Sequence, residues 1–168
     1  MITNYKKYNE SLKDKLKGKS NKDILKSLDG LSDSDKIRKI IKNKLSYDLL
    51  LIPLIIDGNL ECFNKKLTEL PDNLTVNGNL YCYDNQLTSL PNDLKVNGNL
   101  YCNHNQLTSL PDDLTVEGNL YCTNNKLTSL PDNLIVSGDL FCNDNKFLSN
   151  IKKPKGVKGK IYHYNYYN

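Results

Sequence analysis

Four consecutive segments of twenty residues follow one another without a gap and share most of their sequence. They read PDNLTVNGNLYCYDNQLTSL (71–90), PNDLKVNGNLYCNHNQLTSL (91–110), PDDLTVEGNLYCTNNKLTSL (111–130) and PDNLIVSGDLFCNDNKFLSN (131–150). A more divergent copy, LIPLIIDGNLECFNKKLTEL (51–70), precedes them. Self-similarity at a fixed, short period is typical of solenoids, in which each repeat contacts only its neighbours. The sequence therefore predicts a stack of similar coils.

The segment G-N-L-Y-C of each repeat alternates as a short β-strand does. In the first well-preserved copy the alternation places Leu80 and Cys82 on one face, and Asn79, Tyr81 and Tyr83 on the other. Stacked coils pair these strands into a parallel sheet with neighbours about 4.8 Å apart. The predicted inward columns are Leu60, Leu80, Leu100, Leu120 and Leu140 beside Cys62, Cys82, Cys102, Cys122 and Cys142.

The rest of each repeat closes the coil. Further apolar columns are formed by Leu74, Val76, Leu87 and Leu90 and by their equivalents twenty residues apart. A proline at the start of each repeat breaks any helix, so the outer, convex side is predicted to be extended or 3₁₀-helical. The asparagines of the last inward position are expected to satisfy backbone groups of the turn from inside: Asn85, Asn105, Asn125 and Asn145.

All five cysteines stand in this pattern, twenty residues apart. A metal site needs soft ligands that converge on one point, and a disulfide needs converging Cβ atoms, whereas a column offers neither arrangement. A nucleophilic thiol needs a basic neighbour and exposure. Cysteine is, however, among the residues most often buried as a small apolar side chain. The cysteines are predicted to be core residues, and neither a metal nor a cofactor is expected.

The pattern L-P-x-x-L-x-V-x-G-x-L-x-C-x-x-N-x-L-T-x resembles the leucine-rich-repeat family, over about residues 50–150. It is most similar to the short twenty-residue repeats of YopM- and IpaH-type bacterial effectors, and to repeats of phage and giant-virus proteins. The resemblance implies a parallel sheet on a concave face that binds proteins. IpaH-type effectors also carry a ubiquitin-ligase domain with a Cys-x-Asp motif; C-Y-D (82–84) and C-N-D (142–144) echo it inside the repeats, and no ligase domain is expected.

The two ends depart from the repeat. Residues 1–48 contain apolar positions at helical spacing and are predicted to be a helical N-terminal cap. Residues 49–150 hold the five repeats, and residues 151–168 are predicted to be a degenerate capping coil in which Val157, Gly159 and Ile161 take repeat positions. The expected fold class is accordingly α+β: a helical cap followed by a leucine-rich-repeat solenoid.

Charge and composition limit the possible environments. Residues 1–48 have a net charge of +6, residues 49–150 of −7 and residues 151–168 of +5. The N-terminus has no apolar signal segment, and the longest apolar run is eight residues and contains Pro53, too short to span a membrane. An odd number of cysteines favours a reducing, intracellular compartment, in the source cell or in an infected host. A monomer without membrane contact is favoured.

The outward strand positions are the candidate binding surface. Tyrosine combines a rigid contact area with a polar tip, and a central aromatic column flanked by amides suits a protein or peptide. The same aromatic row could instead serve only to stabilise the sheet. The predicted partner-binding residues are Glu61, Tyr81, Tyr83, Tyr101, Asn103, Tyr121, Phe141 and Tyr162.

The predicted function is a non-enzymatic protein-interaction module. No P-loop, zinc-protease or serine-hydrolase motif is present, and His104 beside Asp84 lacks a third catalytic partner. A structural or self-assembling component, for example of a virion, is the alternative. Nucleic-acid binding through the basic ends is a weaker one, because the sheet is acidic or neutral and Arg38 is the only arginine.

Overall fold

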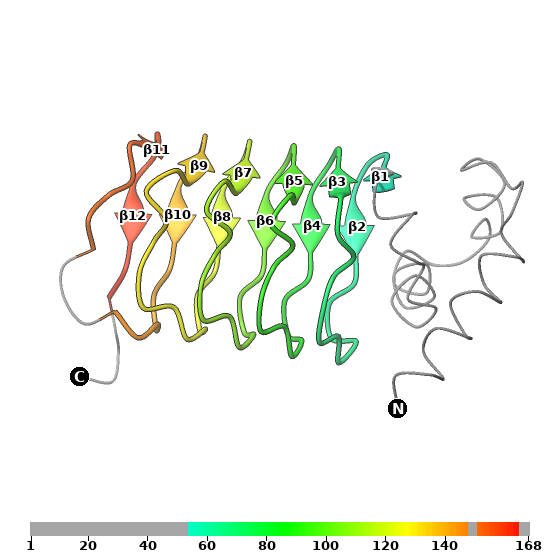
Figure 1. The fold of residues 1–168 in the computed structure, drawn as a ribbon, viewed down its shortest axis with the longest axis horizontal. Helices are drawn as coiled ribbons and strands as arrows, with labels where there is room; N and C mark the ends of the chain where they lie inside the picture. Colours follow the sequence, from blue (N-terminus) through cyan, green and yellow to red (C-terminus); the bar gives the residue numbers. More distant parts are fainter. Residues whose placement is uncertain (1–53, 148–150, 165–168) are drawn as a thin grey trace, which may run out of the picture.

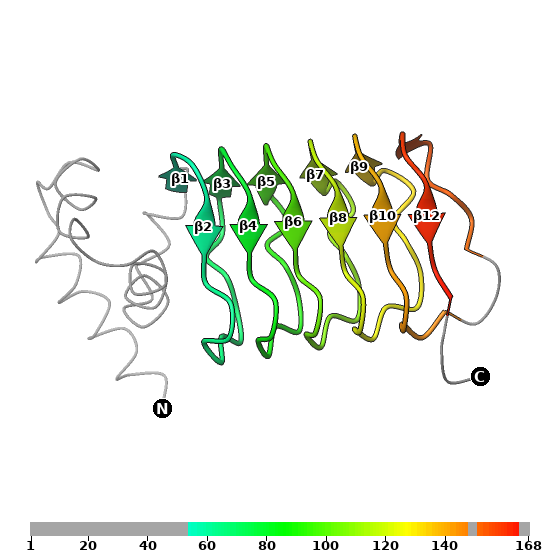
Figure 2. The same ribbon diagram turned by 180° about the vertical axis from the view of Figure 1, so that it is seen from behind.

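The computed structural model describes residues 54–147 and 151–164, which form a solenoid of short strands stacked along one axis (Figure 1). Each coil contributes one strand to each of two parallel sheets, seen from opposite sides in Figures 1 and 2. Sheet A contains β1 (Leu54–Ile56), β3 (Leu74–Val76), β5 (Lys95–Val96), β7 (Thr115–Val116), β9 (Ile135–Val136) and β11 (Gly156–Val157). Sheet B contains β2 (Leu60–Glu61), β4 (Leu80–Tyr81), β6 (Leu100–Tyr101), β8 (Leu120–Tyr121), β10 (Leu140–Phe141) and β12 (Ile161–Tyr162).

Register follows directly from the period of the sequence. Leu80 pairs with Leu100, and Leu100 with Leu120, so equivalent residues lie side by side. The last coil carries one additional residue, and Leu140 therefore pairs with Ile161 and Val136 with Val157. Because the repeats contain no gap, every extended segment of one coil meets its equivalent in the next.

Sheet A was not anticipated. The Leu-x-Val segment, which the sequence predicted only as an extended or 3₁₀ convex side, alternates in the same way as sheet B: Leu74 and Val76 are buried, and Thr75 is partly exposed. When such a triplet repeats in register, its backbone N–H and C=O groups form hydrogen bonds with the neighbouring coils, and its two buried side chains pack in the core. The convex side is therefore a second sheet.

The predicted α+β class is wrong: the described residues contain only strands and irregular segments and are all-β. The proline of each repeat and the short strand-forming segments leave no room for a helix between the sheets. The helical cap predicted for residues 1–48 lies outside the described residues, and the structure gives it no support. Within residues 54–147 and 151–164 there is no apolar helix long enough to cross a bilayer.

The core runs the length of the solenoid between the two sheets. The predicted inward leucines and cysteines of sheet B, from Leu60 to Cys142, all have 0% exposure. Val76, Val96, Val116 and Val136 of sheet A lie opposite and are at most 1% exposed. Full burial of each leucine stabilises the fold by about 1.5–3 kcal/mol.

The interior asparagines form a hydrogen-bonded ladder, as predicted. Asn105 Oδ1 accepts the backbone N–H of Leu87 at 3.0 Å, and its Nδ2 donates to the carbonyls of Cys82 and Cys102 at 3.0 and 3.1 Å. The same contacts recur for Asn85, Asn125 and Asn145. Each asparagine side chain thus links its own coil to the preceding one at a turn, where the two coils are not joined by strand pairing.

A glycine column brings the coils close together at the corner before sheet B. A Cβ atom on Gly98 would lie 2.5 Å from Asn79 Oδ1 and 2.7 Å from the carbonyl carbon of Gly78. The backbone carbon cannot move aside without separating the coils. Close approach of two main chains, rather than an unusual φ angle, therefore requires glycine at this position.

We predict that Gly98→Ala lowers the free energy of unfolding by about 1–3 kcal/mol, the usual cost of forcing an atom into a filled site. Urea denaturation followed by circular dichroism measures the change. Asn97→Ala is the control, because this exposed neighbour makes one side-chain hydrogen bond, from its Nδ2 to Asn77 Oδ1. Equal stability of Gly98→Ala and the wild type would contradict the close approach.

Candidate interaction surface

The outward face of sheet B carries the predicted site residues side by side. Each two-residue strand turns its first residue, a leucine or in β12 Ile161, toward the core and its second residue outward. The central column therefore consists of Glu61, Tyr81, Tyr101, Tyr121, Phe141 and Tyr162. Glu61 is exposed, and the aromatic members are half-buried. The structure places the aromatic members in one continuous row.

The rings of this row stack face to face along the solenoid. Centroids of neighbouring rings lie 4.8 Å apart for Tyr81 and Tyr101, 4.5 Å for Tyr101 and Tyr121, and 4.7 Å for Tyr121 and Phe141, with interplanar angles of 3–11°. Tyr162 continues the row at 4.7 Å. We call these five side chains the aromatic row. Because neighbouring rings cover all ring faces except the outer ones at the two ends, the aromatic row presents mainly ring edges and the tyrosine hydroxyls to solvent.

Asparagines fix the hydroxyl ends of the tyrosines. Asn79 Nδ2 donates to the hydroxyl oxygen of Tyr81 at 3.0 Å, and Asn119 Nδ2 donates to that of Tyr121 at 3.2 Å. The same asparagines accept, through Oδ1, the backbone N–H of the equivalent residue in the next coil, as from Asn99 to Asn79 at 2.7 Å. Each asparagine is thus held at both ends, and the surface is ordered before any partner binds.

The hydroxyl of Tyr101 stays protonated near pH 7. Partial burial raises the pKa of Tyr101, and the neighbouring Tyr121 raises it further, although the hydrogen bond from Asn99 acts in the opposite direction. Charged side chains beside the aromatic row are the carboxylates of Glu61, Asp84 and Asp139 and, in the last coil, the ammonium group of Lys160.

A second, shorter stack lies beside the aromatic row at its N-terminal end. The rings of Phe63 and Tyr83 are parallel, with centroids 4.8 Å apart, and Phe63 is 37% exposed. The same flank continues through Asn103 and then Thr123, both half-buried. The predicted residues Tyr83 and Asn103 therefore lie on the same face as the aromatic row. Phe63, which stacks on Tyr83, belongs with them.

The column that contains His104 has a backbone explanation. Asn64, Asp84, His104, Asn124 and Asp144 all have φ between 51° and 54°. Asparagine, aspartate and histidine are enriched among non-glycine residues in this left-handed region. Asp84 and His104 thus lie in equivalent turns, each of which follows a strand of sheet B. Among the described residues, no group of three or more His, Cys, Asp or Glu side chains is arranged to hold a metal ion.

The cysteines lie in the core and are not part of the surface. All five are thiols and fully buried. Burial raises the pKa of Cys102 to about 12 and that of Cys142 to about 12. For Cys82, burial and then the neighbouring thiols Cys102 and Cys62 raise the pKa well above its usual value. A protonated, enclosed thiol is a poor nucleophile.

We predict that a polar alkylating reagent such as iodoacetate modifies none of the five cysteines of the native protein within hours at pH 8. All five should react within minutes in 8 M urea, because thiolate formation and access both require unfolding. Mass spectrometry of the intact protein counts the adducts. Rapid native labelling of two or more cysteines would contradict the buried column.

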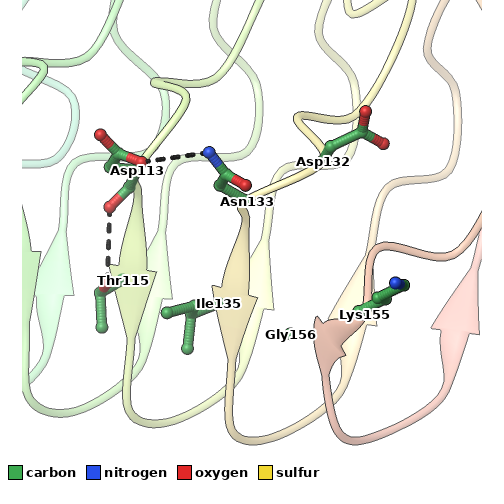
Figure 3. Close-up of a pocket in the computed structure, with 7 residues that line it drawn as sticks. All are labelled: Asp113, Thr115, Asp132, Asn133, Ile135, Lys155 and Gly156. Atoms are coloured by element: carbon green, nitrogen blue, oxygen red, sulfur yellow. Dashed lines mark hydrogen bonds between the residues drawn. The ribbon is translucent and has the colours of Figure 1, made fainter.

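Sheet A carries a hollow of about 470 Å³ near its C-terminal end (Figure 3). Gly156 leaves a gap in the outward column next to Ile135, which is 41% exposed. Asp113 and Asn133 border it, joined by a long hydrogen bond of 3.5 Å, and Lys155 lies at the other side. The hollow is open, and none of the polar side chains that line it is buried. The hollow has no counterpart among the sequence-based predictions, because sheet A itself was not predicted.

The fold and this surface define a parallel β-solenoid of twenty-residue leucine-rich coils with an aromatic outward face. No family model and no curated protein matches the chain. Among solved structures, the chain is similar to a Shigella effector LRR domain, with 23% sequence identity and a TM-score of 0.43. The similarity covers 89% of this chain and 61% of that chain, so this chain spans less than two thirds of the length of the other. The leucine-rich-repeat character rests on the coils described above.

Proposed function

We propose that this protein is a non-enzymatic interaction module that binds a protein partner through the outward face of sheet B. The binding residues are those of the aromatic row together with Glu61, Tyr83 and Asn103. The observation that carries the proposal is the uninterrupted stack of half-buried rings, together with the asparagines that hold the hydroxyls of Tyr81, Tyr101 and Tyr121. A rigid aromatic surface loses little conformational entropy on binding.

A protein fits this face better than a nucleic acid does. The carboxylates of Glu61, Asp84 and Asp139 flank the aromatic row and would repel phosphates. Ring faces that could stack on bases are already covered by neighbouring rings, apart from those at the two ends of the aromatic row. Ring edges, hydroxyls and amides are suited to the mixed apolar and polar surface of a polypeptide. We place this interaction in a reducing compartment, where the thiols stay unmodified.

Single substitutions in the centre of the aromatic row test the proposal. The partner is captured from a lysate of the source cells on immobilised wild-type protein, identified by mass spectrometry, and then measured in purified form. Tyr101→Ala and Tyr121→Ala should each weaken binding at least about tenfold, the effect of losing a central aromatic contact. Ile135→Ala removes an exposed apolar side chain from sheet A and should leave binding unchanged.

Stability must be measured on the same variants, because the aromatic row also supports the sheet. Tyr101 has two stacked neighbours, and its removal should cost about 1–3 kcal/mol of unfolding free energy. Tyr101→Phe keeps both stacks and serves as the matched control for fold. A folded Tyr101→Ala protein that binds as tightly as the wild type would show that the aromatic row is purely structural.

A further inference from the structure

Among the described residues, no further coil covers the two strand edges and the part of the core that lie beyond β11 and β12. Among the described strands, β11 is paired only with β9, and β12 only with β10. The inward leucines of the preceding coils are 0% exposed, whereas Ile161, at the same position of the last coil, is only partly buried. Ile151 is likewise partly buried against the core. We call β11, β12 and the lysines of residues 152–160 the C-terminal edge.

The side-chain ladder that joins successive coils ends at this edge. Through the array, Oδ1 of each outward asparagine accepts the N–H of the next coil, and the last such bond runs from the Lys160 N–H to Asp139 Oδ1 at 2.8 Å. Lys160 occupies the next position in the ladder and has no acceptor atom. A further coil of the same sequence would find no oxygen for its N–H at this point. The edge is therefore not built to continue the repeat.

Charge separates the C-terminal edge from the rest of the solenoid. Residues 54–147 contain twelve acidic and five basic side chains, whereas residues 151–164 contain five lysines and no acidic residue. Lys153 Nζ donates a hydrogen bond to the carbonyl oxygen of Gly159, and Lys152 Nζ lies 3.8 Å from Asp132 Oδ1 in an exposed ion pair. Within the described part of the chain, the ammonium groups of Lys155, Lys158 and Lys160 have no hydrogen-bond or ion-pair partner and are exposed.

We propose that the C-terminal edge binds an extended acidic segment of a partner protein, which adds a strand beside β12. Backbone groups of an edge strand pair with an incoming strand, and alternate side chains supply specificity. An apolar residue of that segment would cover Ile161, and glutamates or aspartates would face Lys158 and Lys160. A second copy of this chain does not fit, because two such edges would bring five lysines of each copy together. This inference does not depend on the proposed use of the sheet B face.

The probe is a fluorescent, end-blocked hexapeptide, Glu-Val-Glu-Ile-Glu-Val, titrated with the full-length chain and followed by anisotropy at low and at moderate salt. Its counterpart Lys-Val-Lys-Ile-Lys-Val has the same strand propensity and the opposite charge. We expect the acidic peptide to bind at least about tenfold more tightly than the basic one, with affinity falling as salt rises. N-methylation of alternate backbone nitrogens should abolish binding, because it removes the strand hydrogen bonds.

Two double variants locate the site. The double variant Lys158→Glu with Lys160→Glu should weaken binding of the acidic peptide at least about tenfold. The control, Lys95→Glu with Lys126→Glu, makes the same change of charge on exposed residues of the acidic coils and should change the affinity by no more than about twofold. No binding, equal binding of both peptides, or equal effects of the two double variants would overturn the proposal. So would a concentration-dependent doubling of mass in light scattering without peptide, since a second copy would then occupy the edge.

Discussion

An Asn105→Ala protein is expected to lose about 2–6 kcal/mol of its free energy of unfolding. The substitution leaves the buried N–H of Leu87 without its acceptor, at about 1–3 kcal/mol, and removes donors to the carbonyls of Cys82 and Cys102, at about 0.5–1.5 kcal/mol each. These carbonyls retain the amides of Asn85 and Asn125, respectively, which keeps the loss from being larger.

The neighbouring asparagine provides the control. Asn103 lies two residues away on the outward face and is half-buried, so Asn103→Ala should change stability by less than about 0.5 kcal/mol. Asn105→Asp keeps the shape but replaces the donor by a buried carboxylate that faces two carbonyl oxygens, and should be at least as destabilising as alanine. Urea titration of the three variants decides the matter. Similar midpoints for Asn103→Ala and Asn105→Ala would show that the interior ladder contributes little.

The free energy of unfolding should also fall steeply as the pH rises above about 8.5, the pKa of an unfolded thiol. An unfolded thiol ionises near pH 8.5, whereas Cys102 and Cys142 in the folded protein have pKa values of about 12. Above pH 8.5 the unfolded chain therefore releases protons that the folded chain keeps. The contribution of these protonated thiols to the free energy of unfolding is fully present below pH 8.5. Above that pH it falls by about 1.4 kcal/mol per pH unit for each thiol, until the thiols of the folded protein ionise as well.

Cys82 and Cys122 shift in the same direction, so four thiols act together. Together they would lower the free energy of unfolding by about 5 kcal/mol per pH unit, which would exhaust the stability of an ordinary domain within about two to three pH units above pH 8.5. Urea unfolding at several pH values between 7 and 10, with a reductant present, measures the slope. Cys102→Ala should reduce it by about 1.4 kcal/mol per pH unit, whatever its stability at pH 7. Stability that is independent of pH up to 10 would contradict the buried, protonated column.

Much of sheet B could be predicted from the sequence, because its determinants are local. The period fixes which residues become neighbours, and the alternation in G-N-L-Y-C fixes which of them point inward. The inward positions of Leu80 and Cys82 and the interior role of Asn85 were predicted on this basis and are confirmed. The use of Tyr81 and the other site residues for binding stays a prediction, since no feature of the free protein reports an absent partner.

The second sheet could have been found by the same reasoning. Leu74, Thr75 and Val76 alternate over only three residues, which is too short to distinguish a strand from an irregular extended segment in a single copy. Exact repetition removes the ambiguity, because equivalent extended segments in adjacent coils must lie in register. The α+β class was wrong: it depended on the helical spacing in residues 1–48, whereas the described residues are all-β. That region lies outside the described residues.

The role of Asn79 and its equivalents in holding the tyrosine hydroxyls was also missed. The signal was present: an asparagine stands two residues before the aromatic residue of three successive coils, on the same face of the strand. The left-handed column was visible as well, since only asparagine, aspartate and histidine occupy it. Both features depend on how side chains bond to backbone across coils, and composition alone does not reveal that.

Coil-to-coil contact that repeats at a strict interval has an evolutionary consequence. In-frame duplication or deletion of one sixty-nucleotide unit would lengthen or shorten the molecule by a whole layer and leave every remaining interface intact, since Leu100 finds the same neighbours in Leu80 and Leu120 that any inserted leucine would find. Loss of a single residue within a strand, by contrast, would turn the inward side chains of that strand to the outward face. Selection can therefore adjust the reach of the aromatic face through unequal crossing-over more readily than through point mutation.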